Sequence, residues 1–239
     1  MINTRNGIYL MINILTSKTI FANDEIYQVL KKYIKPTHKV CVVAFSFFLD
    51  DYSKKTYLNS YQKETGEWYL HIVKPLYKYG IKEENINFIL YNKDSKEEAL
   101  NKINEADIIF LPGGAPDLFM ERLAEYDLVN HLRSLNKIFM GPSAGSMIQF
   151  DWFHISKDKD YHKFSINKGL GLIDGFGIEV HFNRRKQQKK GLRRVSHYNP
   201  RVVYTVLETG IIILENNKIV YKKDAYKYYK EGRRIKNRQ

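Results

Sequence analysis

Short apolar runs rich in β-branched residues alternate with segments of helical periodicity along the first 140 residues, and no other feature constrains the fold as strongly. Continuous apolar runs of this kind are typical of strands that are buried on both faces of a parallel sheet. The pattern therefore predicts an α/β fold with a doubly wound, mostly parallel sheet and helices on both of its faces. We predict strands at 9–15, 39–45, 86–91, 107–111 and 137–140, and helices at 24–33, 67–79 and 95–103.

The pattern changes after residue 180, where apolar runs follow one another without intervening helices. We predict strands at 201–207, 210–215 and 218–221, with a tight turn at Glu215-Asn216-Asn217-Lys218 and an aromatic segment at 226–229 behind them. These strands would extend the sheet as a C-terminal antiparallel hairpin. Because no linker or low-complexity tract interrupts the chain before residue 180, we expect residues 1–239 to form a single domain, with a disordered basic tail at 230–239.

Charge divides the sequence at the same place. The 239 residues include 39 Lys and Arg and 26 Asp and Glu, which gives a formal net charge of +13. Residues 1–180 hold 22 basic and 22 acidic side chains, so the whole excess lies in the last 59 residues, with 17 basic and 4 acidic. A composition that is 44% hydrophobic excludes a disordered or fibrous protein. We therefore expect a neutral globular core that is followed by a basic segment.

The single cysteine, Cys41, excludes an intramolecular disulfide framework and a multi-cysteine metal site. It lies in the apolar run 40–45, where a buried strand residue is expected rather than a nucleophile. The apolar stretch at 7–15 is too short to span a bilayer, and no small-residue cleavage site follows it. We therefore expect a cytoplasmic protein without a membrane partner.

The most specific motif is Gly141-Pro142-Ser143-Ala144-Gly145, between a predicted strand and a helix-compatible run. In that setting Gly-x-Ser-x-Gly is typical of a nucleophile elbow, in which a strand turns abruptly into a helix and holds the serine in a strained conformation. Small neighbours are needed because the chain passes close to itself. Ser143 is therefore the candidate nucleophile, and the Ala144 N–H is a candidate donor to an oxyanion. The alternative is a glycine-rich turn without chemistry.

A second glycine-rich loop, Pro112-Gly113-Gly114-Ala115-Pro116, also follows a predicted strand. The carboxyl ends of parallel strands meet at one edge of a sheet, so this loop is expected beside Ser143 if the two strands are neighbours. Gly114 is a candidate for the second oxyanion N–H, because glycine lets the backbone approach a reacting carbonyl.

A serine nucleophile needs a general base, and the sequence contains seven histidines. His71 and His131 lie in helix-like segments, and His38 stands just before a strand, at the edge opposite the candidate site. His181 comes at the end of the strand-like run 175–182 and would be presented at the strand terminus. His154 and His162 follow the candidate nucleophile closely and remain alternatives.

Four motifs follow one another along the chain: Pro112-Gly113-Gly114, Gly141-Pro142-Ser143-Ala144-Gly145, Gly169-Leu170-Gly171-Leu172 and Val180-His181-Phe182. Their order resembles the peptidase E (aspartyl dipeptidase) family of serine peptidases, which includes cyanophycinase-like enzymes. The similarity covers nearly the whole chain. It implies a fold similar to the class I glutamine amidotransferases and flavodoxin-like proteins, with serine where the amidotransferases carry cysteine.

The resemblance also implies roles for single residues. Ser143 would be the nucleophile and His181 its base, with the N–H groups of Gly114 and Ala144 forming the oxyanion hole. The spacing of the family's acid falls on Asp158. Asp160 is a close alternative, and Glu179 is another because it lies two residues before His181 on the same face of that strand. The resemblance implies a small peptide as substrate and neither a metal nor an organic cofactor.

A basic segment follows the candidate base, with seven Lys or Arg and no acid in residues 183–194. Arg184 or Arg185 would be placed to pair with an acidic substrate group, which predicts a peptidase that favours an acidic residue before the scissile bond. Two alternatives remain: a nucleic-acid or anion-binding module that uses this basic region, and a non-catalytic amidotransferase-like protein. A monomer and a homodimer are both compatible with the sequence.

Overall fold

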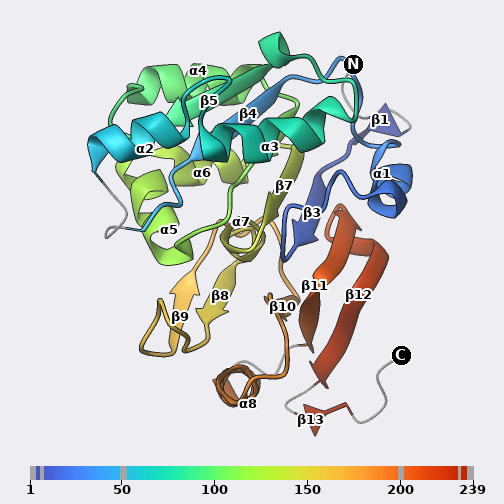
Figure 1. The fold of residues 1–239 in the computed structure, drawn as a ribbon. Coiled ribbons are helices and arrows are strands. Elements are labelled where there is room, and N and C mark those ends of the chain that lie inside the picture. The colour runs from blue at the N-terminus through green and yellow to red at the C-terminus, as the bar shows by residue number, and fades with distance from the viewer. Residues whose placement is uncertain (1–3, 6–7, 49–52, 199–201, 231–232, 236–239) are drawn as a thin grey trace.

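The predicted parallel strands form the centre of one mixed sheet (Figure 1). The computed structural model describes residues 4–5, 8–48, 53–198, 202–230 and 233–235. Its parallel strands lie in the order β3 (Ile12–Thr16), β7 (Ile138–Pro142), β6 (Ile108–Phe110), β4 (Val40–Ala44) and β5 (Ile86–Leu90). The predicted mostly parallel sheet is confirmed. Its first strand begins later than predicted, because β2 (Ile8–Tyr9) pairs with β1 (Thr4–Arg5) instead.

Successive residues of these strands face opposite sides of the sheet. Cys41 and Val43 belong to the hydrophobic core on one side, whereas Val40, Val42 and Ala44 belong to the core on the other. All five side chains are completely buried. Strands that are covered on both faces need an apolar residue at every position, which explains the continuous apolar runs in the sequence.

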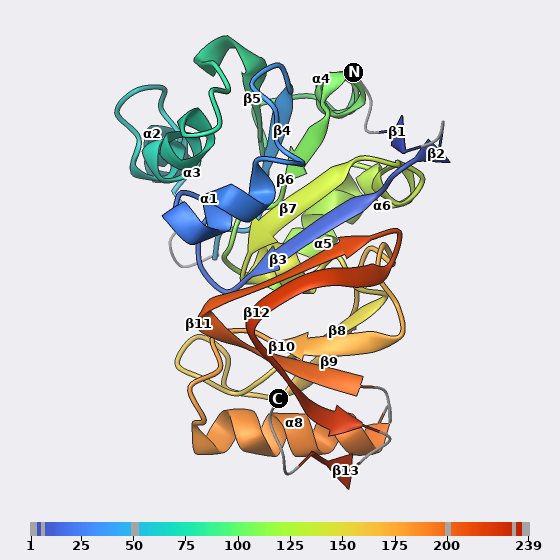
Figure 2. The ribbon, with the colours of Figure 1, turned by 90° about the vertical axis from the view of Figure 1, so that its right-hand side faces the viewer.

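Helices cover both faces of the sheet (Figure 2). One face carries α1 (Asp24–Leu30), α2 (Lys54–Ser60) and α3 (Glu67–Tyr77), and the other carries α4 (Lys96–Glu105), α5 (Pro116–Glu125), α6 (Leu128–Arg133) and α7 (Ala144–Met147). A short 3₁₀ helix (Glu83–Asn85) precedes β5. The predicted start of α4 is correct, since Ser95 and Glu98 form a reciprocal capping box. Within the described ranges, no helix is long and apolar enough to cross a membrane.

The C-terminal hairpin extends the sheet beyond β3. β11 (Val202–Glu215) runs antiparallel to β3, β12 (Lys218–Lys230) pairs with β11, and β13 (Arg233–Arg234) pairs with β12. The predicted turn is present, with positive φ angles at Asn216 and Asn217. Two predicted strands are in fact one strand, β11, and the aromatic segment belongs to β12. Residue 201 and, in the predicted tail, residues 231–232 and 236–239 lie outside the described residues.

The remaining elements lie beyond the carboxyl ends of the parallel strands (Figures 1 and 2). They are β8 (Trp152–Ile155), β9 (Ser165–Lys168), β10 (Phe176–Glu179) and α8 (Lys186–Tyr198). No helix was predicted in the basic segment, where α8 forms. The apolar face of α8 is narrow, because Leu192 and Val195 are buried against Phe182 and β12 while the charged residues around them are exposed.

Candidate active site

Ser143 lies between the last residue of β7 and the first residue of α7. Its backbone has φ 52° and ψ −115°, a conformation that costs free energy and that the surrounding contacts must hold. The Ser143 N–H donates to the carbonyl of Thr16 at 2.9 Å. At Gly141 and Gly145, a side-chain carbon would overlap the carbonyl of Leu111. The small residues of the motif are therefore required by the close approach of β6 to this turn.

The loop after β6 adjoins Ser143, as expected for neighbouring strands. Gly114 has φ 144°, and a side chain there would overlap the carbonyl of Ser46. The next N–H, of Ala115, donates to that same carbonyl at 2.6 Å. Gly114 and Ser143 line the same cavity. Ala144 begins α7, where N–H groups have no acceptor within the helix.

His181 follows β10 and is held by its backbone. Its φ is 51°, and its N–H donates to Ser17 Oγ at 2.9 Å, while Ser17 Oγ donates to the carbonyl of Val206 at 3.0 Å. The imidazole Nδ1 lies 2.8 Å from Oε2 of Glu208. His181 lines both of the cavities that Ser143 lines. The structure thus brings Ser143, Gly114 and His181 to one place.

Glu208 reaches His181 from an irregular part of β11. The pairing of β11 with β12 passes from Val206 opposite Ala225 to Ile211 opposite Lys223, so four residues of β11 lie opposite Asp224 alone. Such a bulge bends the strand and redirects its side chains. Glu208 was not predicted as a site residue, because residues 208 and 209 fall between two of the predicted strands. The glycine at position 210 inside a strand pattern was the available signal for a bulge.

The three acids predicted as candidates for the triad have partners other than His181. Asp158 Oδ1 accepts from the N–H groups of Asp160 and Tyr161, at 2.9 and 2.8 Å, and so closes a turn in its own loop. Asp158 and His181 line the same cavity, but the carboxylate in contact with the imidazole is that of Glu208. The Asp160 carboxylate lies 3.9 Å from the ammonium group of Lys159.

Glu179 belongs to a buried pair next to the same cavity. Its Oε2 lies 2.5 Å from Nε2 of His154 and accepts from Ser156 Oγ at 2.8 Å. His154 is only 2% exposed. His162, the other alternative base, is exposed and lines a different cavity. Of the described histidines, only His181 lines both of the cavities that Ser143 lines.

Two cavities meet at Ser143 and His181. The smaller, of about 280 Å³, has charged walls of both signs, including Lys157, Asp158 and Arg185. The larger, of about 810 Å³, has aromatic and aliphatic walls. They include Phe47, Tyr57, Tyr61, Trp68, Ile72 and Phe110. A bound chain that passes Ser143 would thus have a charged environment on one side and an apolar one on the other.

The two arginines after His181 lie differently. Arg185 lines the smaller cavity, and its Nε donates to Asn183 Oδ1 at 3.0 Å. Both arginines are exposed, but Arg184, at φ 67°, is not among the described residues that line that cavity. The phenol of Tyr161, also in the wall, donates to Asp117. Burial, aided by this acceptor, raises the pKa of Tyr161, so the group stays a neutral donor.

Comparison with known families agrees with this geometry. The model of peptidase family S51 matches residues 56–228. The chain belongs to peptidase family S51. It is accordingly a serine-type peptidase, and the matched range includes Ser143, His181 and Glu208. In the part of the chain that the structure describes, no group of three or more His, Cys, Asp or Glu side chains is arranged to hold a metal ion.

Two solved structures share the fold of this S51 peptidase. A protein from Listeria monocytogenes EGD-e, assigned to peptidase E, aligns with a TM-score of 0.63 and 16% identity over 90% of this chain and 98% of its own. A peptidase from an acI-B1 actinobacterium aligns with a TM-score of 0.57 and 14% identity over 96% of this chain and 93% of its own. No curated protein matches the sequence.

Proposed function

We propose that this S51 peptidase hydrolyses small peptides with a triad of Ser143, His181 and Glu208. The observation that carries the proposal is the 2.8 Å contact between His181 Nδ1 and Glu208 Oε2, on a histidine that lines the same cavities as Ser143. The strained turn of Ser143 between β7 and α7 supports its role as the serine of a nucleophile elbow. Glu208 takes the place that family spacing suggested for Asp158.

Each group has a distinct task in the reaction. His181 accepts the proton of Ser143 Oγ as that oxygen attacks the peptide carbonyl, and Glu208 keeps the other ring proton on Nδ1 and stabilises the imidazolium. The N–H groups of Gly114 and Ala144 donate to the resulting oxyanion. His181 then protonates the leaving amine, and a water molecule hydrolyses the acyl-enzyme by the same route.

The two cavities suggest how a peptide lies across Ser143. The residue before the scissile bond occupies the smaller cavity, where Arg185 pairs with its acidic side chain. The residue after the bond occupies the larger cavity, whose aromatic walls favour an apolar side chain. This arrangement predicts hydrolysis of peptides with Asp or Glu before, and an apolar residue after, the bond that is cut.

A fluorophosphonate reagent tests the nucleophile directly. We expect one covalent adduct per chain by intact mass, at Ser143 by peptide mapping, and none on Ser143→Ala. His181→Ala should slow the labelling strongly, because the hydroxyl then lacks a base. Equal labelling of the wild-type protein and Ser143→Ala would exclude Ser143. Heat-denatured wild type is the control for non-specific reaction.

A further inference from the structure

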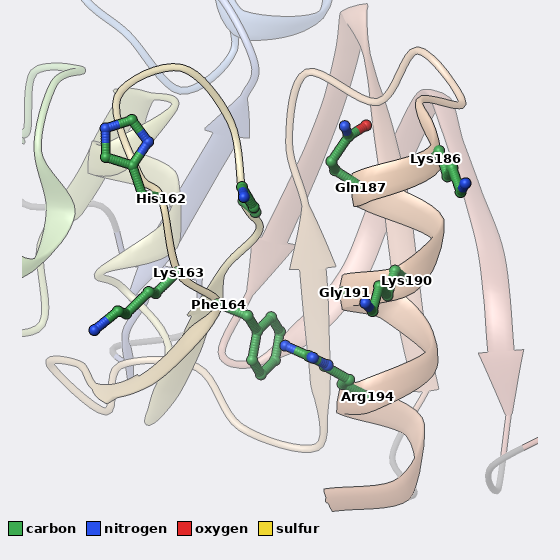
Figure 3. A pocket seen from close by; sticks show the side chains of 9 residues that line it. His162, Lys163, Phe164, Lys186, Gln187, Lys190, Gly191 and Arg194 are labelled. Carbon is green, nitrogen blue, oxygen red and sulfur yellow. The ribbon is translucent and has the colours of Figure 1, made fainter.

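A third cavity, of about 650 Å³, lies between α8 and the connection from β8 to β9 (Figure 3). Five cationic side chains line it, together with the ring of Phe164 and no carboxylate. They are Lys157, Lys163, Lys186, Lys190 and Arg194. No residue of the proposed triad or oxyanion hole is among the described residues that line this cavity.

The cations approach the cavity from two sides. Lys186, Lys190 and Arg194 are spaced four residues apart and therefore lie along one face of α8. Lys157 and Lys163 come from the opposite wall. Among the described residues, none of the five takes part in an ion pair. Figure 3 shows Arg194 extending to Phe164, whereas the ammonium groups of Lys163 and Lys186 point away from the opposite wall. Five cations around one hollow without an acid favour a ligand with several negative charges.

Packing holds the two walls in place. At Gly191, in the middle of α8, a side chain would overlap Ser156 Oγ, so the helix lies directly against the end of β8. The guanidinium of Arg194 lies 5.4 Å from the ring centroid of Phe164 on the opposite wall. These contacts fix the two walls of the groove, although the five cationic side chains themselves are exposed.

The groove is continuous with the catalytic site. Lys157 lines both this cavity and the smaller cavity that contains Ser143, and Arg185 of the smaller cavity directly precedes α8. A substrate that places one acidic residue beside Arg185 can therefore extend toward Lys157 and Lys190. This continuity favours a peptide over a nucleic acid as the occupant.

We propose that the basic groove binds further acidic residues on the N-terminal side of the cleaved bond, so that the preferred substrate is an acidic peptide longer than a dipeptide. The proposal rests on the proposed function for its reaction. It adds a length and charge requirement that the triad and Arg185 do not supply. Each carboxylate in the groove would pair with an exposed ammonium or guanidinium group.

Binding tests the groove independently of activity. The probe is a fluorescein-labelled tetra-aspartate peptide, measured by anisotropy on Ser143→Ala protein at physiological salt. We expect Lys190→Ala with Arg194→Ala to weaken binding about tenfold, the loss typical of two exposed ion pairs. Lys189→Ala with Arg193→Ala removes the same charge from residues of α8 that do not line the groove, and should change binding little. Equal losses in the two double variants would overturn the proposal.

Hydrolysis kinetics provide a second test of the groove. Two substrates share the scissile bond and carry either one or three acidic residues before it. We expect wild-type kcat/KM to be higher for the longer peptide, and the Lys190 and Arg194 double variant to lose that advantage while it cleaves the shorter peptide normally. Cleavage of both peptides without a length preference would overturn the proposed role of the groove and leave the proposed function intact. Cleavage of neither peptide would overturn the proposed function, and the binding measurement would then decide whether the groove binds acidic residues.

A nucleic acid is the competing occupant. A labelled oligothymidylate with the same number of charges serves as the probe in the same anisotropy measurement. Tighter binding of the oligonucleotide through Lys190 and Arg194, without displacement by tetra-aspartate, would assign the groove to nucleic acid and overturn the peptide proposal. Displacement by tetra-aspartate at concentrations near its own Kd would support it.

Discussion

The Nδ1 atom of His181 lies 2.8 Å from Oε2 of Glu208, although 27 residues separate them in the sequence. Pairing of β10 with β11 brings the two segments together, and the bulge in β11 turns the carboxylate toward the ring. Lys18 lies 3.7 Å from the same carboxylate oxygen. Two elements of the sheet therefore meet at a histidine that lines the same cavities as Ser143, and among the described residues Glu208 is the acid in contact with the ring.

Replacing this acid should reduce activity without affecting the fold. Glu208→Gln removes the charge that holds the proton on Nδ1, so we expect kcat/KM to fall by about 10²- to 10⁴-fold. Asp158→Asn is the matched control, because an Asn oxygen can still accept both backbone hydrogen bonds of the 158–161 turn. Steady-state hydrolysis of one peptide substrate measures both. A larger loss in Asp158→Asn would assign the acid to Asp158.

Arg185 should determine the preference for an acidic residue. We expect Arg185→Ala to raise KM for a substrate with Asp before the scissile bond by about tenfold, the loss of one favourable charged hydrogen bond. The matched Asn substrate should be affected much less. Arg184→Ala is the control, since Arg184 is adjacent in sequence and exposed like Arg185 but is not part of the described wall of the smaller cavity. If both variants behave alike, general charge and not Arg185 sets the preference.

The larger cavity should select the residue after the scissile bond. Trp68 of α3 lines it, and we expect Trp68→Ala to lower kcat/KM for substrates with Leu or Phe at that position by about three- to tenfold, with little change for Gly. Tyr77→Ala removes another exposed aromatic side chain from α3 that is not in the described wall of this cavity. A series of peptides that differ only in this residue measures the effect. Equal cleavage of the Leu and Gly peptides by the wild type would contradict the placement.

The backbone at Gly114 should tolerate no side chain. We expect Gly114→Ala to lower the free energy of unfolding by more than about 2 kcal/mol, because strain at φ 144° adds to the overlap with the Ser46 carbonyl. Gly175→Ala is the matched control, at φ 81° with nothing within 4 Å of the added carbon, and should cost only about 1 kcal/mol. Urea denaturation measures both. Equal losses would show that the overlap is relieved without cost.

Cys41 should be inert in the native protein. It is completely buried in β4, and burial raises the pKa of its thiol to about 12, so almost no thiolate exists at neutral pH. We expect no reaction with an aromatic disulfide reagent in native buffer and one thiol per chain in denaturant. Rapid reaction of the native protein would contradict the position of Cys41 in the core.

Features that depend on a few neighbouring residues were predictable. The fully apolar run of β4 indicated a strand covered on both faces, and the helix predicted at 95–103 corresponds to α4, which Ser95 caps. Asn216 and Asn217 marked the hairpin turn, since asparagine accepts positive φ angles at low cost. Gly141 and Gly145 around Ser143 indicated a chain that passes close to itself. In each case the physical constraint acts within one turn of the chain.

Relationships between distant segments were decided by the tertiary structure. Glu208 becomes the partner of His181 because strand pairing and a bulge place it there, while Asp158 satisfies its own loop. The basic segment is prominent in the sequence as net charge. Only in the folded chain does α8 pack beside the β8–β9 connection, so that Lys190 and Arg194 line one cavity with Lys157. The sequence by itself determined the sheet, the turn at Ser143 and the location of the charge. The tertiary structure decided which acid contacts His181 and which cations line one cavity. These contacts join segments that are distant in the sequence, so no local pattern predicts them.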